Sequence, residues 1–247
     1  MSNIGLQRMP GQPIIPRDAG MIQEISRSDE FKQQLRDWLQ NEAIDSPAIT
    51  VAKNSQVYKT GDSDEAVYFI ERGQVKLLML SPEERECLLA IHTSGDIFGE
   101  LCLSGRKTRP ETAMAMEETV VRQIPSSRFL AHLCCKPPFV MGFVQYMSVR
   151  IADQQQVIAN LVTVDSEQRL GKTLLRLAQT LGKKAPNSIR IELRITHEEL
   201  SEMVGTTRPR ISVFMHRFTN LGLIETNADH FLIINGRKLT AYLAQIA

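Results

Sequence analysis

The feature that most constrains this chain is a run of helical spacing between residues 138 and 164. Apolar residues recur there in alternating steps of four and three, with Gln154 inside the series, at Val140, Val144, Met147, Ile151, Ile158 and Leu161. A two-stranded coiled coil buries such a seam, whereas a helix packed on its own domain needs a wider apolar stripe. We therefore expect residues 137–165 to form a long dimerisation helix and the protein to be a homodimer. Gln154 is expected either to fix the register of the seam or to reach a ligand.

The residues before this helix form short β-like runs separated by turns. Runs such as AITVA, AVYFI and QVKLLML lie between residues 48 and 125, with turn signals at Gly61, Gly73, Ser81 and Gly95. Several short strands with regular turns favour a closed antiparallel sandwich or jelly roll. Residues 28–136 are therefore expected to form a β-roll with flanking helices.

The start of the chain is expected to be a flexible arm. Residues 1–27 contain three prolines and little periodicity. A short amphipathic helix is expected from Ser28, as its N-cap, to about Glu42, because one helical face carries Phe31, Leu35, Trp38 and Leu39.

Near the end of the chain, the segment THEELSEMVGTTRPRISVFMHRF predicts two helices joined by a tight turn. Thr196 and Glu199 have the spacing of a capping box, and Gly205 permits the left-handed backbone of a sharp reversal. The second helix has an apolar stripe expected to lie in the core, formed by Ile211, Phe214, Met215, Phe218 and Leu221. Its other face contains no acidic residue.

The leading end of this second helix is basic. Arg208 and Arg210 flank Pro209, which is tolerated in a first turn because those amides have no helical acceptor. Arginine there suits guanine, whose O6 and N7 match the guanidinium fork. The competing interpretation is a solvated face with incidental arginines. We expect DNA contacts from Thr206, Thr207, Arg208, Arg210, Ser212 and Arg217. A hairpin over residues 223–235 would make residues 166–247 a winged helix-turn-helix domain.

Composition argues against several classes of protein. The formal net charge is only +1, so affinity for nucleic acid must come from local clustering. A cupin-type metal enzyme needs about three clustered histidines, and the β-like runs between residues 48 and 125 offer only His92, interpreted as an ordinary strand residue. Cys134 and Cys135 leave a redox role open, but no CxxC-like pair occurs. No segment resembles a signal peptide or a membrane span. We expect a cytoplasmic protein that is not an enzyme and has no cofactor.

The chain resembles the catabolite activator, or Crp/Fnr, family of bacterial transcription regulators over roughly residues 45–235. The segments that carry the resemblance are YKTGDSDEAVYFIERGQVKLL, GDIFGEL and ITHEELSEMVGTTRPRI. It implies an α+β fold with an N-terminal β-roll of the cyclic-nucleotide-binding type, a long dimerisation helix and a C-terminal winged helix-turn-helix. It also implies a homodimer on near-palindromic double-stranded DNA, with RNA polymerase as a candidate partner.

By position, Arg208 matches the first base-contacting arginine of this family. Pro209 and Val213 stand where many members have a glutamate and a second base-reading arginine. The usual target sequence of the family is therefore not expected here.

The identity of any effector is a separate question. The resemblance implies a pocket formed by Gly99, Glu100, Leu101, Arg109, Thr112, Ala113, Gln154 and Gln155. Members that bind cyclic nucleotides carry Arg-Ser-Ala where this chain has Glu111, Thr112 and Ala113, and a carboxylate repels phosphate. A standard cyclic-AMP site is therefore not expected. The alternative is a cyclic-nucleotide site in which Arg106 or Arg109 replaces the missing arginine. Another small molecule, a partner protein or no signal remain open.

Overall fold

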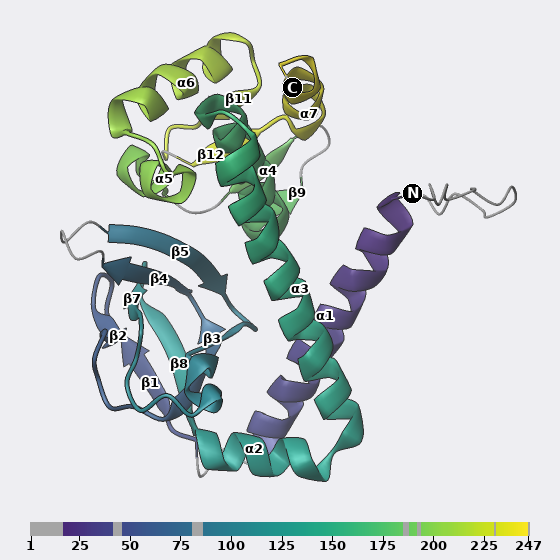
Figure 1. Ribbon diagram of the computed structural model, residues 1–247, viewed down its shortest axis with the longest axis vertical. Coiled ribbons are helices and arrows are strands. Elements are labelled where there is room, and N and C mark those ends of the chain that lie inside the picture. Colours follow the sequence, from purple (N-terminus) through teal and green to yellow (C-terminus); the bar gives the residue numbers. More distant parts are fainter. Residues whose placement is uncertain are drawn as a thin grey trace, which may run out of the picture.

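The computed structural model describes residues 17–41, 46–80, 86–184, 188–191, 194–229 and 231–246. Figure 1 shows a β-roll connected through one long helix, α3 (Pro137–Thr163), to a mainly helical C-terminal part. Within the described residues, no helix is both long and apolar enough to cross a membrane.

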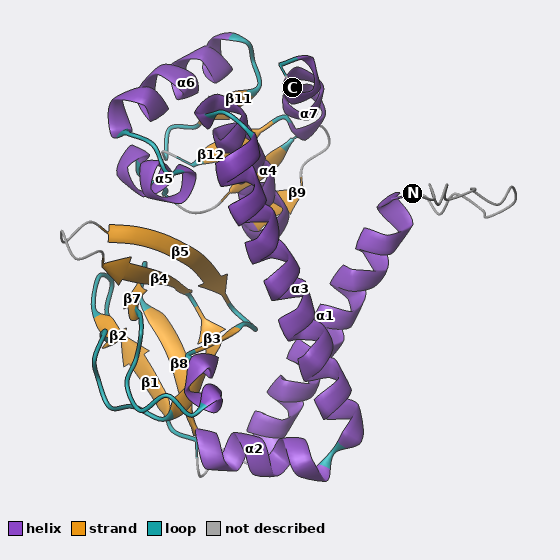
Figure 2. Cartoon of the chain, in the orientation of Figure 1, coloured by secondary structure: helices purple, strands orange, loops and turns teal. Residues whose placement is uncertain are grey.

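Two four-stranded antiparallel sheets form the roll (Figure 2). One has the order β1 (Ala48–Val51), β8 (Thr119–Pro125), β3 (Ala66–Arg72) and β6 (Ile97–Phe98). The other has the order β2 (Gln56–Tyr58), β7 (Thr112–Ala115), β4 (Gln74–Leu80) and β5 (Glu86–Thr93). The predicted antiparallel roll is therefore confirmed. The sequence did not indicate β2 and β6, since they are too short to show a period of two.

The turn predicted at Gly73 joins β3 to β4 by a close backbone approach. Gly73 has a φ of 94°, a left-handed conformation that favours glycine. A Cβ at this position would lie 2.5 Å from Oγ1 of Thr119. Any side chain here would therefore collide with β8.

Helix α1 (Arg17–Asn41) begins earlier than predicted. Residues 17–27 are helical, so the prediction of an irregular arm is wrong for them, and Ser28 lies inside the helix instead of capping it. All three prolines precede Arg17, and proline disfavours helix in the residue before it but not after it. The rest of the predicted arm, residues 1–16, lies outside the described residues.

An aromatic cluster attaches α1 to α3 and to α2 (Ser126–Cys135). The rings of Phe31 and Phe139 have centroids 5.1 Å apart, and those of Phe31 and Tyr146 are 5.2 Å apart. Trp38 packs edge-on against Phe129 in the same cluster. This cluster fixes the first half of α3 on the roll.

In the C-terminal part, the described residues form four helices around a small sheet. Its helices are α4 (Ser166–Leu181), α5 (His197–Val204), α6 (Arg208–Asn220) and α7 (Gly236–Gln245). The sheet has the order β11 (Ile224–Thr226), β12 (Leu232–Ile234), β10 (Ile189–Ile191) and β9 (Gly182–Lys184). The antiparallel pair β11 and β12 is the predicted hairpin of a winged helix-turn-helix.

One detail of this part differs from the prediction. Leu221 is 50% exposed and follows α6 as its C-cap, so it does not belong to the core stripe. The end of a helix turns away from its apolar seam, which periodicity alone does not reveal.

The roll and the C-terminal part share one apolar core. Leu78, Leu88 and Met116 of the roll belong to the same buried cluster as Leu200 and Met203 of α5. At the edge of this contact, Nζ of Lys76 lies 2.8 Å from Oε1 of Glu199. Helix α5 therefore rests on the sheet that contains β4 and β5 (Figure 1).

Candidate DNA-binding surface and roll interior

The turn between α5 and α6 is built as the sequence predicts. The amide of Glu199 donates to Oγ1 of Thr196 at 3.1 Å, and the Thr196 amide donates to Oε2 of Glu199 at 2.9 Å. Gly205, with a φ of 65°, caps α5 in the left-handed conformation. The predicted capping box and glycine turn are both confirmed.

The leading end of α6 is open to solvent. Thr207 is the N-cap but forms no side-chain capping bond, and Pro209 lies in the first turn. Arg208 and Arg210 are exposed. Within the described residues, no hydrogen bond or ion pair involves either guanidinium group. Thr206, at the turn, is half-buried.

Two other predicted contact residues are held by the protein itself. Oγ of Ser212 lies 2.9 Å from Nδ1 of His197. Nη1 of Arg217 lies 2.5 Å from Oε2 of Glu167, whose other oxygen accepts a hydrogen bond of 2.6 Å from the Tyr242 hydroxyl. The hydrogen bond to Glu167 raises the pKa of Arg217 above its ordinary value. The arginines at the start of α6 are thus better placed to accept an external partner.

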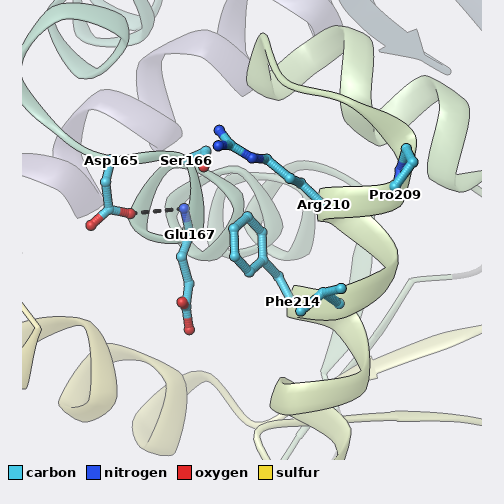
Figure 3. Close-up of a pocket in the computed structure, with 7 residues that line it drawn as sticks. Asp165, Ser166, Glu167, Pro209, Arg210 and Phe214 are labelled. Carbon is cyan, nitrogen blue, oxygen red and sulfur yellow. Dashed lines mark hydrogen bonds between the residues drawn. The ribbon is translucent and has the colours of Figure 1, made fainter.

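An open groove of about 500 Å³ lies between the start of α4 and α6 (Figure 3). Asp165 caps α4, accepting a 2.8 Å bond from the amide of Glu167. The Arg210 side chain extends from α6 toward Ser166, with Phe214 beside it (Figure 3). Arg210 therefore lines this groove while it remains exposed to solvent.

Inside the roll, Arg109 is only 2% exposed. Its Nη2 lies 2.7 Å from Oδ2 of Asp64 and 2.5 Å from the carbonyl oxygen of Ala66. Its Nη1 donates to the carbonyl of Gly99 at 2.6 Å, and the group stacks 4.2 Å from the Tyr58 ring centre. Burial alone would lower the pKa of Arg109, but the bonds to Asp64 hold it above its ordinary value.

Glu111 occupies the position where the family resemblance leads one to expect arginine. It is 2% exposed, and its Oε1 accepts a 2.9 Å bond from the Tyr58 hydroxyl. Its Oε2 is buried without a partner among the described residues, and burial raises the pKa of this carboxyl group. Thr112 accepts a bond from the amide of Thr60, and Ala113 is buried.

Glu100 is connected to the long helix. It is 9% exposed, and its Oε1 lies 3.0 Å from Nη2 of Arg150 in α3. Arg150 also donates to the carbonyl of Ile97 at 3.3 Å. His92, beside them, is buried with its pKa lowered to about 4 by burial and by Arg150, so it is neutral at pH 7.

The predicted effector residues do not all come together in one chain. Five of them lie together in the roll, namely Gly99, Glu100, Arg109, Thr112 and Ala113. The other three, Leu101, Gln154 and Gln155, are exposed. Arg106 is also exposed. Sequence reasoning missed Asp64 and Arg150, because partners 45 and 50 residues away carry no periodic signal. Within the described residues, no group of three or more His, Cys, Asp or Glu could hold a metal ion.

Two family models match the chain. A cyclic nucleotide-binding domain matches residues 48–133, and a Crp-like helix-turn-helix domain matches residues 168–242. The chain is 25% identical over 191 residues to a CRP-like cAMP-activated global transcriptional regulator of Mycobacterium tuberculosis, covering 77% of this chain and 85% of that protein. It is 29% identical over 165 residues to a global nitrogen regulator of Synechocystis sp., covering 66% of this chain and 73% of that protein.

Solved structures share the fold. A CooA mutant from Carboxydothermus hydrogenoformans matches with a TM-score of 0.68 at 26% identity, covering 81% of this chain and 88% of that chain. FixK2 from Bradyrhizobium japonicum matches with a TM-score of 0.69 at 17% identity, covering 79% and 96% respectively. The second likeness concerns the fold alone.

Proposed function

The chain belongs to the Crp/Fnr family of transcription regulators and is itself a DNA-binding regulator, and we propose that it reads near-palindromic sites as a homodimer through α6. The observation that carries this proposal is the pair of exposed guanidinium groups at Arg208 and Arg210, which have no partner among the described residues. Their donors are available to base edges or phosphates without breaking any internal bond.

Arg208 is proposed to read one base pair directly. Arg208→Ala should lose about 1–3 kcal/mol of discrimination at a single position of the site, because a bidentate pair with guanine is removed. The measurement is fluorescence anisotropy at fixed salt, on a duplex selected from a random pool and on its single-base variants. Arg72→Ala is the control, since Arg72 is exposed on the roll in a surface pair with Glu118. Equal losses on all sequences would exclude base contact.

The exposed seam of α3 supports the homodimer. In the single chain Val144 and Ile151 are each 51% exposed and Ile158 is 62% exposed, although apolar residues at this spacing are normally buried between helices. Met147 instead packs half-buried against the aromatic cluster of its own chain. A second copy of α3 would cover the exposed members.

Sedimentation tests the homodimer. Val144→Asp with Ile151→Asp should give monomers, because two buried charges without partners strongly oppose association. Gln156→Asp places a charge on an exposed position outside the seam and should leave the dimer intact. A dimer that persists in the double variant would refute the seam.

We further propose that the roll does not hold a cyclic phosphate in the standard way. Arg109 already binds Asp64 and the carbonyls of Ala66 and Gly99. Glu111 places a carboxylate in the same interior. For Arg109 to replace the missing arginine, it would have to abandon these partners, which leaves buried acceptors unsatisfied.

Calorimetry with cyclic AMP and with cyclic GMP tests this proposal. Neither nucleotide is expected to bind at micromolar concentrations, and micromolar binding of either would overturn the proposal. A small-molecule effector of another kind and RNA polymerase, the partner of transcription regulators at promoters, remain part of the proposed function. So does a cytoplasmic location.

A further inference from the structure

The connection between α3 and α4 leaves the orientation of α6 to side-chain contacts. Helix α3 ends at Thr163 and α4 begins at Ser166, with Val164 and Asp165 between them. Helix α6 is not adjacent to α3 in the chain, because α4, the small sheet and α5 intervene. In a dimer joined through α3, the contacts of the helix-turn-helix with the end of α3, together with the packing of α5 on the roll, therefore decide how far apart the two α6 helices lie.

Arg169, in the first turns of α4, supplies such a contact. Its Nε donates to the carbonyl of Val204 at 2.8 Å, and its Nη1 donates to the carbonyl of Val164 at 2.7 Å. Longer bonds of 3.4 Å reach the carbonyls of Leu161 and Gly205. One guanidinium group thus touches the end of α3 and the turn before α6.

The chemistry of these four acceptors favours arginine. The last carbonyls of a helix have no intrahelical donor and carry the negative end of the helix dipole. The acceptors belong to the C-terminal ends of α3 and of α5. A planar guanidinium has five donors in a fixed fork and can satisfy both ends together, whereas the compact lysine ammonium cannot reproduce that geometry.

Packing beside Arg169 connects the same two elements. A Cβ on Gly205 would lie 3.0 Å from Cδ2 of Leu161. Leu161 is a member of the seam of α3, and Gly205 is the turn residue that directs α6. The end of the proposed dimer helix is thus in close contact with the helix-turn-helix turn.

We propose that Arg169 is a positioning residue that, together with the packing of α5 on the roll, fixes the spacing between the two α6 helices of the dimer, and hence the half-site spacing that the protein prefers. This inference rests on the proposed dimeric reading of DNA. Arg169 touches no base itself in this role. It acts by holding the helix-turn-helix turn against the end of α3.

Binding to a series of operators tests the inference. Two copies of the selected half-site are placed at successive spacings in otherwise identical duplexes, and affinity is measured at fixed salt with full-length protein. The wild type should prefer one spacing by about tenfold or more, since two-fold binders require half-sites one helical turn or a multiple apart. Arg169→Lys should reduce that preference to about threefold or less, because the bridge between the two helix ends is lost.

A matched control and a second variant keep the test sharp. Arg194→Lys is the control, because Nε of Arg194 also donates to a backbone carbonyl, that of Asp229, and within the described residues the Arg194 side chain forms no bond to α3. It should keep the wild-type spacing preference. Leu161→Ala removes the contact with Gly205 without changing Arg169; because Leu161 also belongs to the seam, the variant is measured at concentrations where sedimentation shows a dimer, and there it should broaden the preference by a smaller factor. If a melting experiment shows that Arg169→Lys does not fold, Leu161→Ala still tests whether the contact between α3 and the turn sets the spacing preference.

The outcomes separate the two proposals. If the wild type prefers one spacing and both Arg169→Lys and Leu161→Ala keep that preference unchanged, the role of Arg169 is overturned and the dimeric reading stands. If the wild type itself shows no spacing preference, the dimeric reading fails. Loss of spacing preference in Arg169→Lys, with single-base preferences within each half-site retained, supports the positioning role, because a merely destabilised domain would lose both.

Discussion

Arg109 in the roll and Arg208 at the start of α6 differ in what their guanidinium groups contact. Arg109 is 2% exposed and is bound by Asp64 and by the carbonyls of Ala66 and Gly99. Arg208 is exposed, and no partner occurs for its side chain within the described part of the chain. The same residue type therefore serves folding in one region and remains available for binding in the other.

This difference follows from the free energy of moving a charge out of water. A buried guanidinium is tolerated only when carboxylates and carbonyls satisfy its donors. An exposed one exchanges water for phosphate or base edges with little penalty. The presence of an arginine in a roll of this family is therefore no evidence for phosphate binding until its partners are known.

The largest effect, a loss of folding stability, is expected from removing the buried guanidinium group of Arg109. Arg109→Met should destabilise folding by about 3–5 kcal/mol, since the Asp64 carboxylate loses its cationic partner and keeps only the bonds from the Tyr68 hydroxyl and the Ala66 amide, and two carbonyls lose the guanidinium donor. Denaturant unfolding measures the change. Arg208→Met, made in parallel, should unfold like the wild type. A loss below about 1 kcal/mol in Arg109→Met would show that solvent replaces the guanidinium easily.

A smaller effect, on the discrimination between bases, is expected from changing the exposed arginines of α6. Arg208→Lys with Arg210→Lys keeps both charges but removes the guanidinium fork. Discrimination between bases should fall by about 1–3 kcal/mol for each bidentate pair that is lost. The slope of log affinity against log salt should stay nearly constant, because the number of neutralised phosphates is unchanged. A changed slope with intact base preference would assign these arginines to phosphates instead.

The smallest effect lies where the two regions meet, at Glu202 of α5. Its Oε2 is buried without a partner among the described residues, and burial, aided by Glu86 of β5, raises the pKa of Glu202 to about 7. Other groups that act on this carboxyl group are Lys76, which lowers the pKa, and Glu199 and Glu198, which raise it.

A carboxyl group with a raised folded-state pKa favours the folded protein at low pH. This contribution is present below the unfolded-state pKa of about 4.3 and is lost as pH rises through about 7. Glu202→Gln should therefore raise the melting temperature by about 1–2 °C at pH 8 and have little effect at pH 5. Glu225→Gln, at an exposed position in the wing, is the control. An equal shift at both pH values would exclude titration of Glu202 as the cause.

Local patterns predicted the elements that bear the DNA-binding surface. The capping box of Thr196, the turn at Gly205 and the stripe of Ile211 and Phe218 are all encoded within a few residues of each other, and the structure contains them. Helix periodicity gave α3 in the same way. Each of these signals depends only on neighbours in the chain.

Long-range polar pairing could not be predicted in this way. The sequence offered Arg109 as a possible phosphate ligand, but its actual partner Asp64 lies 45 residues earlier. Gln154 was expected in the seam or at a ligand, and it lies on an exposed position of the single chain, where only a second copy could decide its role. Arg217 likewise forms its ion pair with Glu167, 50 residues away in the chain.

The common apolar core of Leu78, Leu88 and Met116 with Leu200 and Met203 has a consequence for how the protein comes apart. Neither the sheet nor α5 can separate without exposing the apolar surface of the other, so heat should melt both in one cooperative calorimetric transition. Substitutions that destabilise the wing and substitutions that destabilise the roll would then have the same effect in a cell, which is a lower amount of folded protein.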